Sequence, residues 1–179
     1  MTTRLNRLFF PLLLACSICG AGDLPDPHIT PGATNPEVTQ DNIQSTVCVK
    51  GFTKTIRPPA YYTNRLKKQQ LEQYGYADQD QKHYEEDHLI ALSIGGSPRD
   101  PKNLWPQPRK SQWSAQENDA LEIVLYKMVC RGELPLAQAQ HEMATDWIKA
   151  YKAYYPSTGE RLRASGSIRN AAAAITANC

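Results

Sequence analysis

Apolar side chains recur at helical spacing in three stretches of the chain. The clearest helix follows Ser114, because Ser114 and Glu117 have the spacing of a capping box. The apolar positions that come next fall on one helical face: Leu121, Val124, Leu125, Met128 and Val129. The pattern also predicts helices over residues 63–74, where Gly75 ends the helix, and over residues 136–154.

Between the first predicted helix and the capping box, the pattern changes to that of extended chain. Residues 84–94 contain a run of four apolar residues and predict a strand, after which the glycine pair 95–96 turns the chain. Residues 103–105 predict a short second strand, which Pro106 and Pro108 are expected to end. The order helix, strand, loop, strand, helix, helix predicts an α+β domain.

The two ends of the chain differ in composition from its middle. Residues 1–22 predict a cleaved export signal, because basic residues precede a short apolar run and small residues follow it. Residues 23–44 are rich in proline and polar side chains and predict an extended linker. Residues 156–179 predict a flexible C-terminal tail, so the ordered domain is expected to span residues 45–155.

The net charge limits the kind of partner that the protein can have. The whole chain has 20 Lys and Arg and 18 Asp and Glu residues. Arg4 and Arg7 lie in the predicted signal, so the exported protein retains 18 residues of each sign. A charge near zero excludes a strongly basic protein that coats nucleic acid, and any anionic partner must be bound by a local patch.

Export to the periplasm or out of the cell also changes the interpretation of the cysteines. Cys48, Cys130 and Cys179 remain after the signal, and two of them should pair in an oxidising compartment. We favour Cys48–Cys130, which ties the start of the domain to a helix end, because Cys179 is the last residue of the tail. In an alternative interpretation of the signal, Cys16 is the lipidated residue of a lipobox and the protein is an envelope lipoprotein.

The residues with the clearest chemistry lie on the first predicted strand. His88 directly follows Asp87, and adjacent side chains on a strand point to opposite faces. Asp87 can therefore hold a metal ion while His88 faces a water molecule. Asn103 comes after the glycine turn and a proline-rich loop. The alternative for Asp87 and His88 is a structural ion pair near the surface.

These residues read D-H-L-I-A-L-S-I-G-G over 87–96 and N-L-W-P over 103–106. Together they resemble the signature of the HNH (His-Me finger) nucleases. The resemblance is greatest to a subgroup of exported bacterial HNH-like proteins whose second strand ends in N-L-W-P. It implies a ββα-metal core with flanking α-helices, in agreement with the strand, strand, helix order predicted from the pattern.

The resemblance also implies roles for individual residues. It makes His88 the base that activates water, Asp87 a ligand of one divalent metal ion and Asn103 the brace of the loop that carries the histidine. Family members usually have a last ligand, His or Asn, at the start of the helix. Asn118 is our candidate for that ligand, and Asp119 is its close rival. Mg²⁺ suits such oxygen ligands, and Mn²⁺ or another divalent ion is an alternative.

Basic residues indicate where a phosphate backbone can bind, and the candidates are Arg57, Lys67, Lys68 and Arg109. A solvated helix face is the alternative for this patch. The expected function is metal-dependent endonuclease activity on DNA, with RNA left open and with low sequence preference. The alternative is a catalytically degenerate HNH-fold module of the cell envelope that binds nucleic acid, a wall polymer or another protein.

Overall fold

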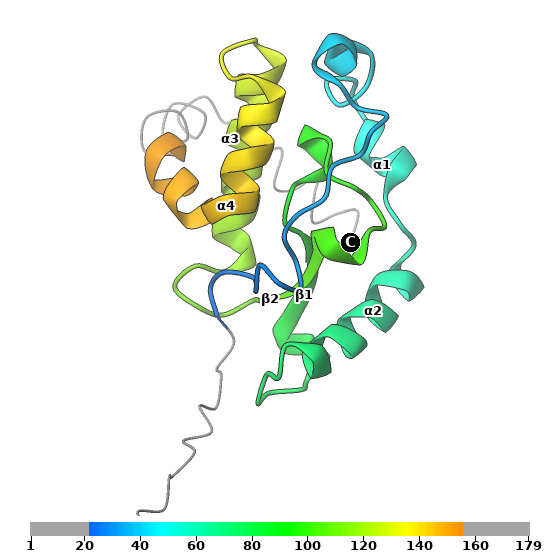
Figure 1. Ribbon diagram of the computed structural model, residues 1–179, viewed down its shortest axis with the longest axis vertical. Coiled ribbons are helices and arrows are strands. Elements are labelled where there is room, and N and C mark those ends of the chain that lie inside the picture. Colours follow the sequence, from blue (N-terminus) through cyan, green and yellow to red (C-terminus); the bar gives the residue numbers. More distant parts are fainter. Residues whose placement is uncertain (1–21, 156–179) are drawn as a thin grey trace, which may run out of the picture.

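The computed structural model, which describes residues 22–155, has the element order of an α+β fold (Figure 1). Its helices are α1 (Phe52–Ile56), α2 (Ala60–Gln73), α3 (Ala115–Cys130) and α4 (Leu136–Tyr154). Its strands are β1 (Tyr84–His88) and β2 (Leu104–Pro108). Short 3₁₀ turns lie at Gln40–Ser45, Gln81–His83, Leu92–Ile94 and Pro101–Asn103. Helix α2 packs against both strands, and α3 and α4 lie side by side.

The two strands pair antiparallel, with His88 opposite Leu104. β1 ends at His88. The strand predicted over residues 84–94 is therefore too long, because the apolar residues 89–94 are not part of it. The apolar residues after His88 are buried, but they belong to a loop whose backbone bonds to Asn103. A run of apolar residues indicates burial and does not by itself distinguish a strand from other buried chain.

β2 continues through the prolines that were expected to end it. Pro106 lies opposite Glu86 and Pro108 lies opposite Tyr84, so both prolines are paired strand residues. Each strand of a two-stranded sheet has one free edge, and a proline is tolerated where its missing N–H would point to that edge. The prediction that Pro106 and Pro108 end the second strand is therefore wrong.

Helices α3 and α4 are the elements that the sequence predicts best. The Ser114 Oγ accepts a hydrogen bond from the Gln116 N–H, and the Glu117 Oε2 accepts one from the Ser114 N–H at 3.0 Å, which confirms the capping box. α4 has one non-helical residue, Asp146, with φ −163° and ψ 88°. The packed side of α3 buries the predicted positions Leu121, Val124, Leu125 and Val129, and that of α4 buries Met143 and Trp147.

Residues 23–39 form no helix or strand, as their composition indicates, and a 3₁₀ turn begins at Gln40, but the whole segment packs on the domain and is not a free linker. The Thr30 Oγ1 donates to the Leu104 carbonyl at 3.1 Å, which attaches the segment to β2. Val38 and Ile43 are buried in the hydrophobic core. The few apolar residues of a proline-rich stretch thus anchor it, and the ordered domain includes this segment.

Some of the predictions concern residues outside the described part of the chain. These are the tail over residues 156–179 with Cys179, Cys16, and the signal over residues 1–22 apart from Gly22. Within residues 22–155, no helix is both long and apolar enough to cross a membrane.

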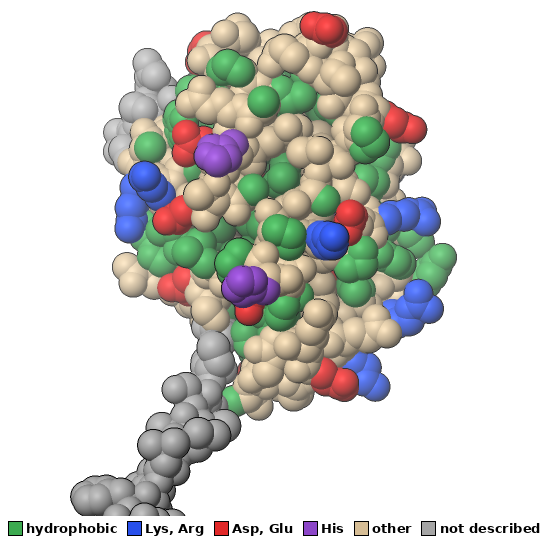
Figure 2. Space-filling model, viewed as in Figure 1, with side chains coloured by type: hydrophobic (Ala, Val, Ile, Leu, Met, Phe, Trp, Pro, Cys, Tyr) green, Lys and Arg blue, Asp and Glu red, His purple; other side chains and the backbone are tan. Residues whose placement is uncertain are grey.

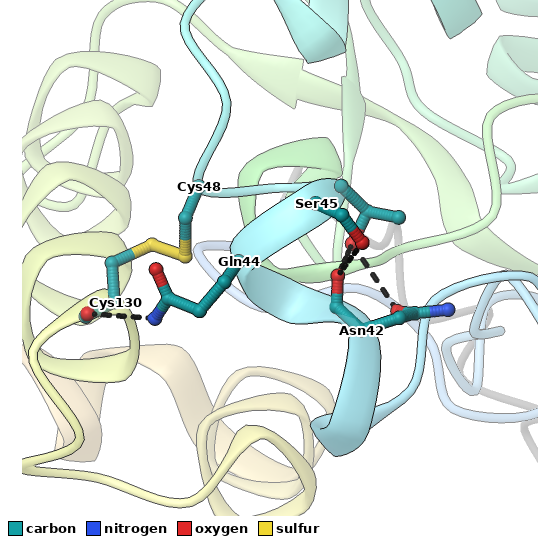
Figure 3. The surroundings of a disulfide bond; sticks show 6 residues. Asn42, Gln44, Ser45, Cys48 and Cys130 are labelled. Atoms are coloured by element: carbon teal, nitrogen blue, oxygen red, sulfur yellow. Dashed lines mark hydrogen bonds between the residues drawn. A yellow bond between two sulfur atoms is a disulfide. The ribbon is translucent and has the colours of Figure 1, made fainter.

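A disulfide joins Cys48 to Cys130, as predicted (Figure 3). It connects the turn that follows the first 3₁₀ segment to the last residue of α3, and the Gln44 Nε2 donates to the Cys130 carbonyl at 3.1 Å beside it. The two cysteines are separated by 82 positions in the sequence, so α1, α2, β1 and β2 all lie inside the closed loop. A long closed loop removes much of the conformational entropy of the unfolded chain.

We expect the double variant Cys48→Ala, Cys130→Ala to lose about 4 kcal/mol of unfolding free energy, because it restores the entropy of this long loop. Urea unfolding followed by circular dichroism measures the loss. Reductant should destabilise the wild-type protein and leave the double variant unchanged. A loss below ~1 kcal/mol would contradict a stabilising role for the bond.

Candidate functional site

The candidate site lies where the end of β1, the loop before β2 and the first half of α3 meet. β1 contributes Asp87 and His88, the residue before β2 is Asn103, and α3 contributes Asn118. The Asn118 Nδ2 lies 3.4 Å from the Asp87 Oδ2. The structure therefore brings together the two residues that the sequence analysis names as metal ligands, one from the strand and one from the helix.

His88 is a buried histidine whose tautomer is fixed by one contact. Only 3% of the residue is exposed, and its Nε2 lies 3.1 Å from the Pro98 carbonyl oxygen. A carbonyl oxygen can only accept, so Nε2 carries the proton and Nδ1 keeps its lone pair. Burial and, to a smaller extent, the charge of Arg57 lower the pKa of His88 to about 4, against the opposing effect of the Pro98 contact. The imidazole is therefore neutral at physiological pH.

Asn103 is fully buried and braces the loop between the strands. Its Nδ2 donates to the carbonyls of Ile90 and Ser97, both at 3.0 Å, and its Oδ1 accepts from the Ile90 N–H at 2.9 Å. The loop needs glycine at Gly96, because a Cβ there would overlap the Ile90 carbonyl. The same loop contains Pro98, whose carbonyl contacts His88. Asn103 is therefore a positioning residue, because it holds the loop that orients the His88 imidazole.

The Asp87 carboxylate lies among other acidic groups. Its Oδ1 accepts a hydrogen bond from the His88 N–H at 2.8 Å. Burial raises the pKa of Asp87 well above its usual value, and the charges of Asp119 and Glu85 add to the rise, whereas Arg57 opposes it. A carboxylate in these surroundings is stabilised by a nearby cation or by protonation.

Two acidic residues of α3 share these surroundings. Burial, followed by the charge of Glu85, raises the pKa of Asp119 to about 6. Burial, followed by the charges of Asp87 and Asp119, raises the pKa of Glu122 well above its usual value. Neither Glu85 nor Glu122 is predicted from the sequence, although two spacings mark them. Glu85 is two residues before Asp87 and so shares its strand face, and Glu122 is one helical turn after Asn118.

The donor groups around Asp87 fit a divalent cation that keeps water ligands. Asn118 is fully buried, and its Nδ2 donates to the Gln107 Oε1 at 3.1 Å. Its Oδ1 has no hydrogen-bond partner among the described residues, and a turn of the amide would bring this oxygen towards Asp87. Mg²⁺ is commonly bound by one or two protein carboxylates together with waters. Within residues 22–155, however, no three His, Cys, Asp or Glu side chains form a complete ligand group.

Two of the predicted basic residues lie close to the acidic groups. Arg57 follows α1 and is exposed, and its charge acts on both Asp87 and His88. Within the described chain, Arg57 forms no ion pair. Arg109 is paired with Glu85 at 2.7 Å, so part of its charge is already neutralised. Arg57 is therefore the better placed of the two for binding a phosphate.

The two predicted lysines of α2 are in opposite settings. Lys68 is exposed, whereas Lys67 is buried and its Nζ donates to the Tyr84 carbonyl at 3.2 Å. Lys67 thus attaches α2 to β1, and the structure does not support its prediction as a substrate contact. Adjacent residues on a helix point in different directions, so two neighbouring lysines in a basic run need not face the same surroundings.

We expect Asn103→Ala to lower the free energy of unfolding by about 3 kcal/mol, because it leaves buried backbone groups of the loop without partners. Chemical unfolding measures this change. Asn64→Ala is the matched control, since Asn64 is exposed on α2, and it should change stability by less than ~0.5 kcal/mol. Equal effects of the two substitutions would rule out the bracing role.

Comparison of the chain with protein-family models, with curated proteins and with solved structures finds no match. The functional assignment therefore depends on the motif, on the arrangement of the site residues and on their chemistry.

Proposed function

We propose that the protein is an exported, metal-dependent endonuclease of the HNH (His-Me finger) type with a ββα-metal core. Its substrate is DNA, with RNA left open, and it has little sequence preference. The observation that carries the proposal is His88, whose buried neutral imidazole is oriented by the Pro98 carbonyl and whose backbone N–H donates to the Asp87 carboxylate. The order β1, β2, α3 accords with this core, and the disulfide accords with an oxidising compartment.

In the proposed reaction His88 is the general base. Its Nδ1 takes a proton from a water molecule, the water oxygen forms a bond to phosphorus, and the bond from phosphorus to the leaving oxygen breaks. A second water gives the leaving oxygen its proton. The Pro98 contact keeps the proton on Nε2, so that the lone pair of Nδ1 is the one that accepts.

Asp87 and Asn118 are the residues that would hold Mg²⁺, or Mn²⁺ as the alternative. The bound ion supplies Lewis-acid stabilisation of the negative charge on the phosphate and on the leaving oxygen. Without the divalent ion, the negative charges of Asp119 and Glu122 add to that of Asp87, and the three carboxylates together repel a phosphate. The cation is therefore expected to support substrate binding as well as the reaction.

Arg57 supplies the positive charge for the phosphate oxygens. A guanidinium binds phosphate through two parallel N–H donors, which also orients the group. Pro58 and Pro59 follow directly and limit the backbone freedom beside the arginine. Arg57 thus serves as a substrate-binding residue on a restrained backbone, and its charge also acts on His88.

A binding module without catalytic activity is the second candidate function. It is favoured by the ligand group, because within residues 22–155 no three His, Cys, Asp or Glu side chains are grouped so that they could hold a metal ion. In that case the half-buried carboxylates would be remnants of a metal site, and the protein would bind its partner without a metal requirement. Metal binding and cleavage distinguish the two functions.

We expect His88→Ala to reduce the rate of plasmid cleavage by at least about 100-fold, because the reaction loses its general base. Cleavage is measured on oxidised residues 23–179 with Mg²⁺, with Mn²⁺ and with chelator, at equal folded concentration. His141→Ala, at an exposed position on α4, should retain full activity. Cleavage by His88→Ala at the wild-type rate would exclude His88 as the base, and no cleavage by folded wild-type protein with metal would favour the binding module.

We expect Asp87→Asn to remove the stabilisation that Mg²⁺ gives the wild-type protein, because a ligand that binds only the folded state raises its stability. Without metal the variant should be more stable than the wild type, since it no longer buries a charge beside Asp119 and Glu85. Thermal unfolding with and without 10 mM Mg²⁺ measures both effects. Asp41→Asn, at an exposed position, is the control. An undiminished response of Asp87→Asn to Mg²⁺ would show that the ion binds elsewhere.

A further inference from the structure

Helix α2 presents an aromatic ring and two cations in one row on its outer face. Tyr61 is 74% exposed, which makes it one of the few large apolar side chains described as exposed. Arg65 and Lys68 are also exposed. The three residues are spaced four and three positions apart, which places them on the same side of a helix. We call Tyr61, Arg65 and Lys68 the α2 row.

The opposite face of α2 is fixed to the sheet by polar contacts. The Lys67 Nζ donates to the Tyr84 carbonyl at 3.2 Å, and the Gln70 Nε2 donates to the Leu104 carbonyl at 2.7 Å. The helix is thus bonded to both strands, and its outer face has a defined orientation. A ring on a rigid helix loses little conformational entropy when a flat partner binds it.

The charge around the α2 row is mostly positive. Residues 50–72 include six Lys or Arg and one acidic residue, the exposed Glu72, which lies on the same side of α2 one turn after Lys68. Figure 2 shows Lys and Arg side chains along the edge of the molecule that α1 and α2 form. Since the exported protein has almost no net charge, this edge is a local basic patch, and it complements an anionic polymer.

The α2 row begins next to the candidate site. Tyr61 is four residues after Arg57, so their backbones are at most about 14 Å apart even for a fully extended chain. The intervening Pro58 and Pro59 restrict that chain. A strand whose phosphate is bound at Arg57 can therefore continue along α2.

We propose that the α2 row binds a single-stranded segment of the nucleic acid, with a base stacked on the Tyr61 ring and neighbouring phosphates bound by Arg65 and Lys68. Unpaired bases can turn a face towards an aromatic side chain, whereas the faces of paired bases are covered within a duplex. The inference rests on the proposed function in one respect, which is that the site next to α2 is taken to be the place where nucleic acid is cleaved. A surface that binds only the duplex backbone would use the two cations and not the ring.

Fluorescence anisotropy with a labelled oligonucleotide of about 12 nucleotides, single-stranded or annealed, tests the proposal in chelator. We expect Tyr61→Ala to weaken single-strand binding about 10-fold, the effect of losing one stacked base, and to change duplex binding less than about twofold. Tyr61→Phe should bind both like the wild type, because the ring remains. Circular dichroism checks that each variant is folded.

The cations are tested by the salt dependence of binding. Arg65→Ala and Lys68→Ala should each lower the slope of log affinity against log salt by about 0.7 on single strands. Lys149→Ala, at an exposed position on α4, should leave the slope unchanged. Equal affinities of wild type and Tyr61→Ala for the single strand, or equal losses on both oligonucleotides, would overturn the proposal.

The measurement in chelator separates this proposal from the nuclease assignment. Ring-dependent binding by a protein that cleaves nothing would support the α2 row and reject the nuclease. If the protein cleaves normally and Tyr61→Ala binds the single strand as tightly as the wild type does, the result would support the nuclease and reject the α2 row.

Discussion

The hydrogen bonds of the Asn103 side chain connect three segments of the chain at one buried point. Its amide bonds to both backbone groups of Ile90 and to the Ser97 carbonyl, and its oxygen also lies 3.4 Å from the Ala33 N–H. One buried side chain therefore joins the N-terminal segment, the loop after β1 and the start of β2. The orientation of His88 depends on this arrangement, because the loop supplies the carbonyl that holds its Nε2.

Local signals in the sequence predict local structure well. The capping box at Ser114 and the apolar face of α3 both follow from spacing within one element, and the structure contains them. The Cys48–Cys130 pairing follows from elimination among three cysteines. The contact between Asp87 of β1 and Asn118 of α3 agrees with the ligand pair that the family resemblance implies.

Features that depend on tertiary contacts are not visible in the sequence. Lys67 belongs to a basic run, yet it faces the sheet because its ammonium reaches a strand carbonyl. Residues 23–44 have the composition of a linker, yet they pack on the domain through Val38 and Ile43. Glu122 joins the acidic site because the fold brings the start of α3 to Asp87 of β1, and no motif in the sequence indicates this contact. In each case the deciding partner is distant in the sequence.

The disulfide encloses every residue to which we assign a role in the site. Asp87, His88, Asn103 and Asn118 all lie between Cys48 and Cys130, and so does the α2 row. A single proteolytic cut anywhere in that stretch leaves the two fragments covalently joined. Proteases are present in the exported compartment that we propose for the protein, and the disulfide keeps both halves of the site at high local concentration after such a cut. The bond thus limits the consequences of a single cut, in addition to stabilising the folded state.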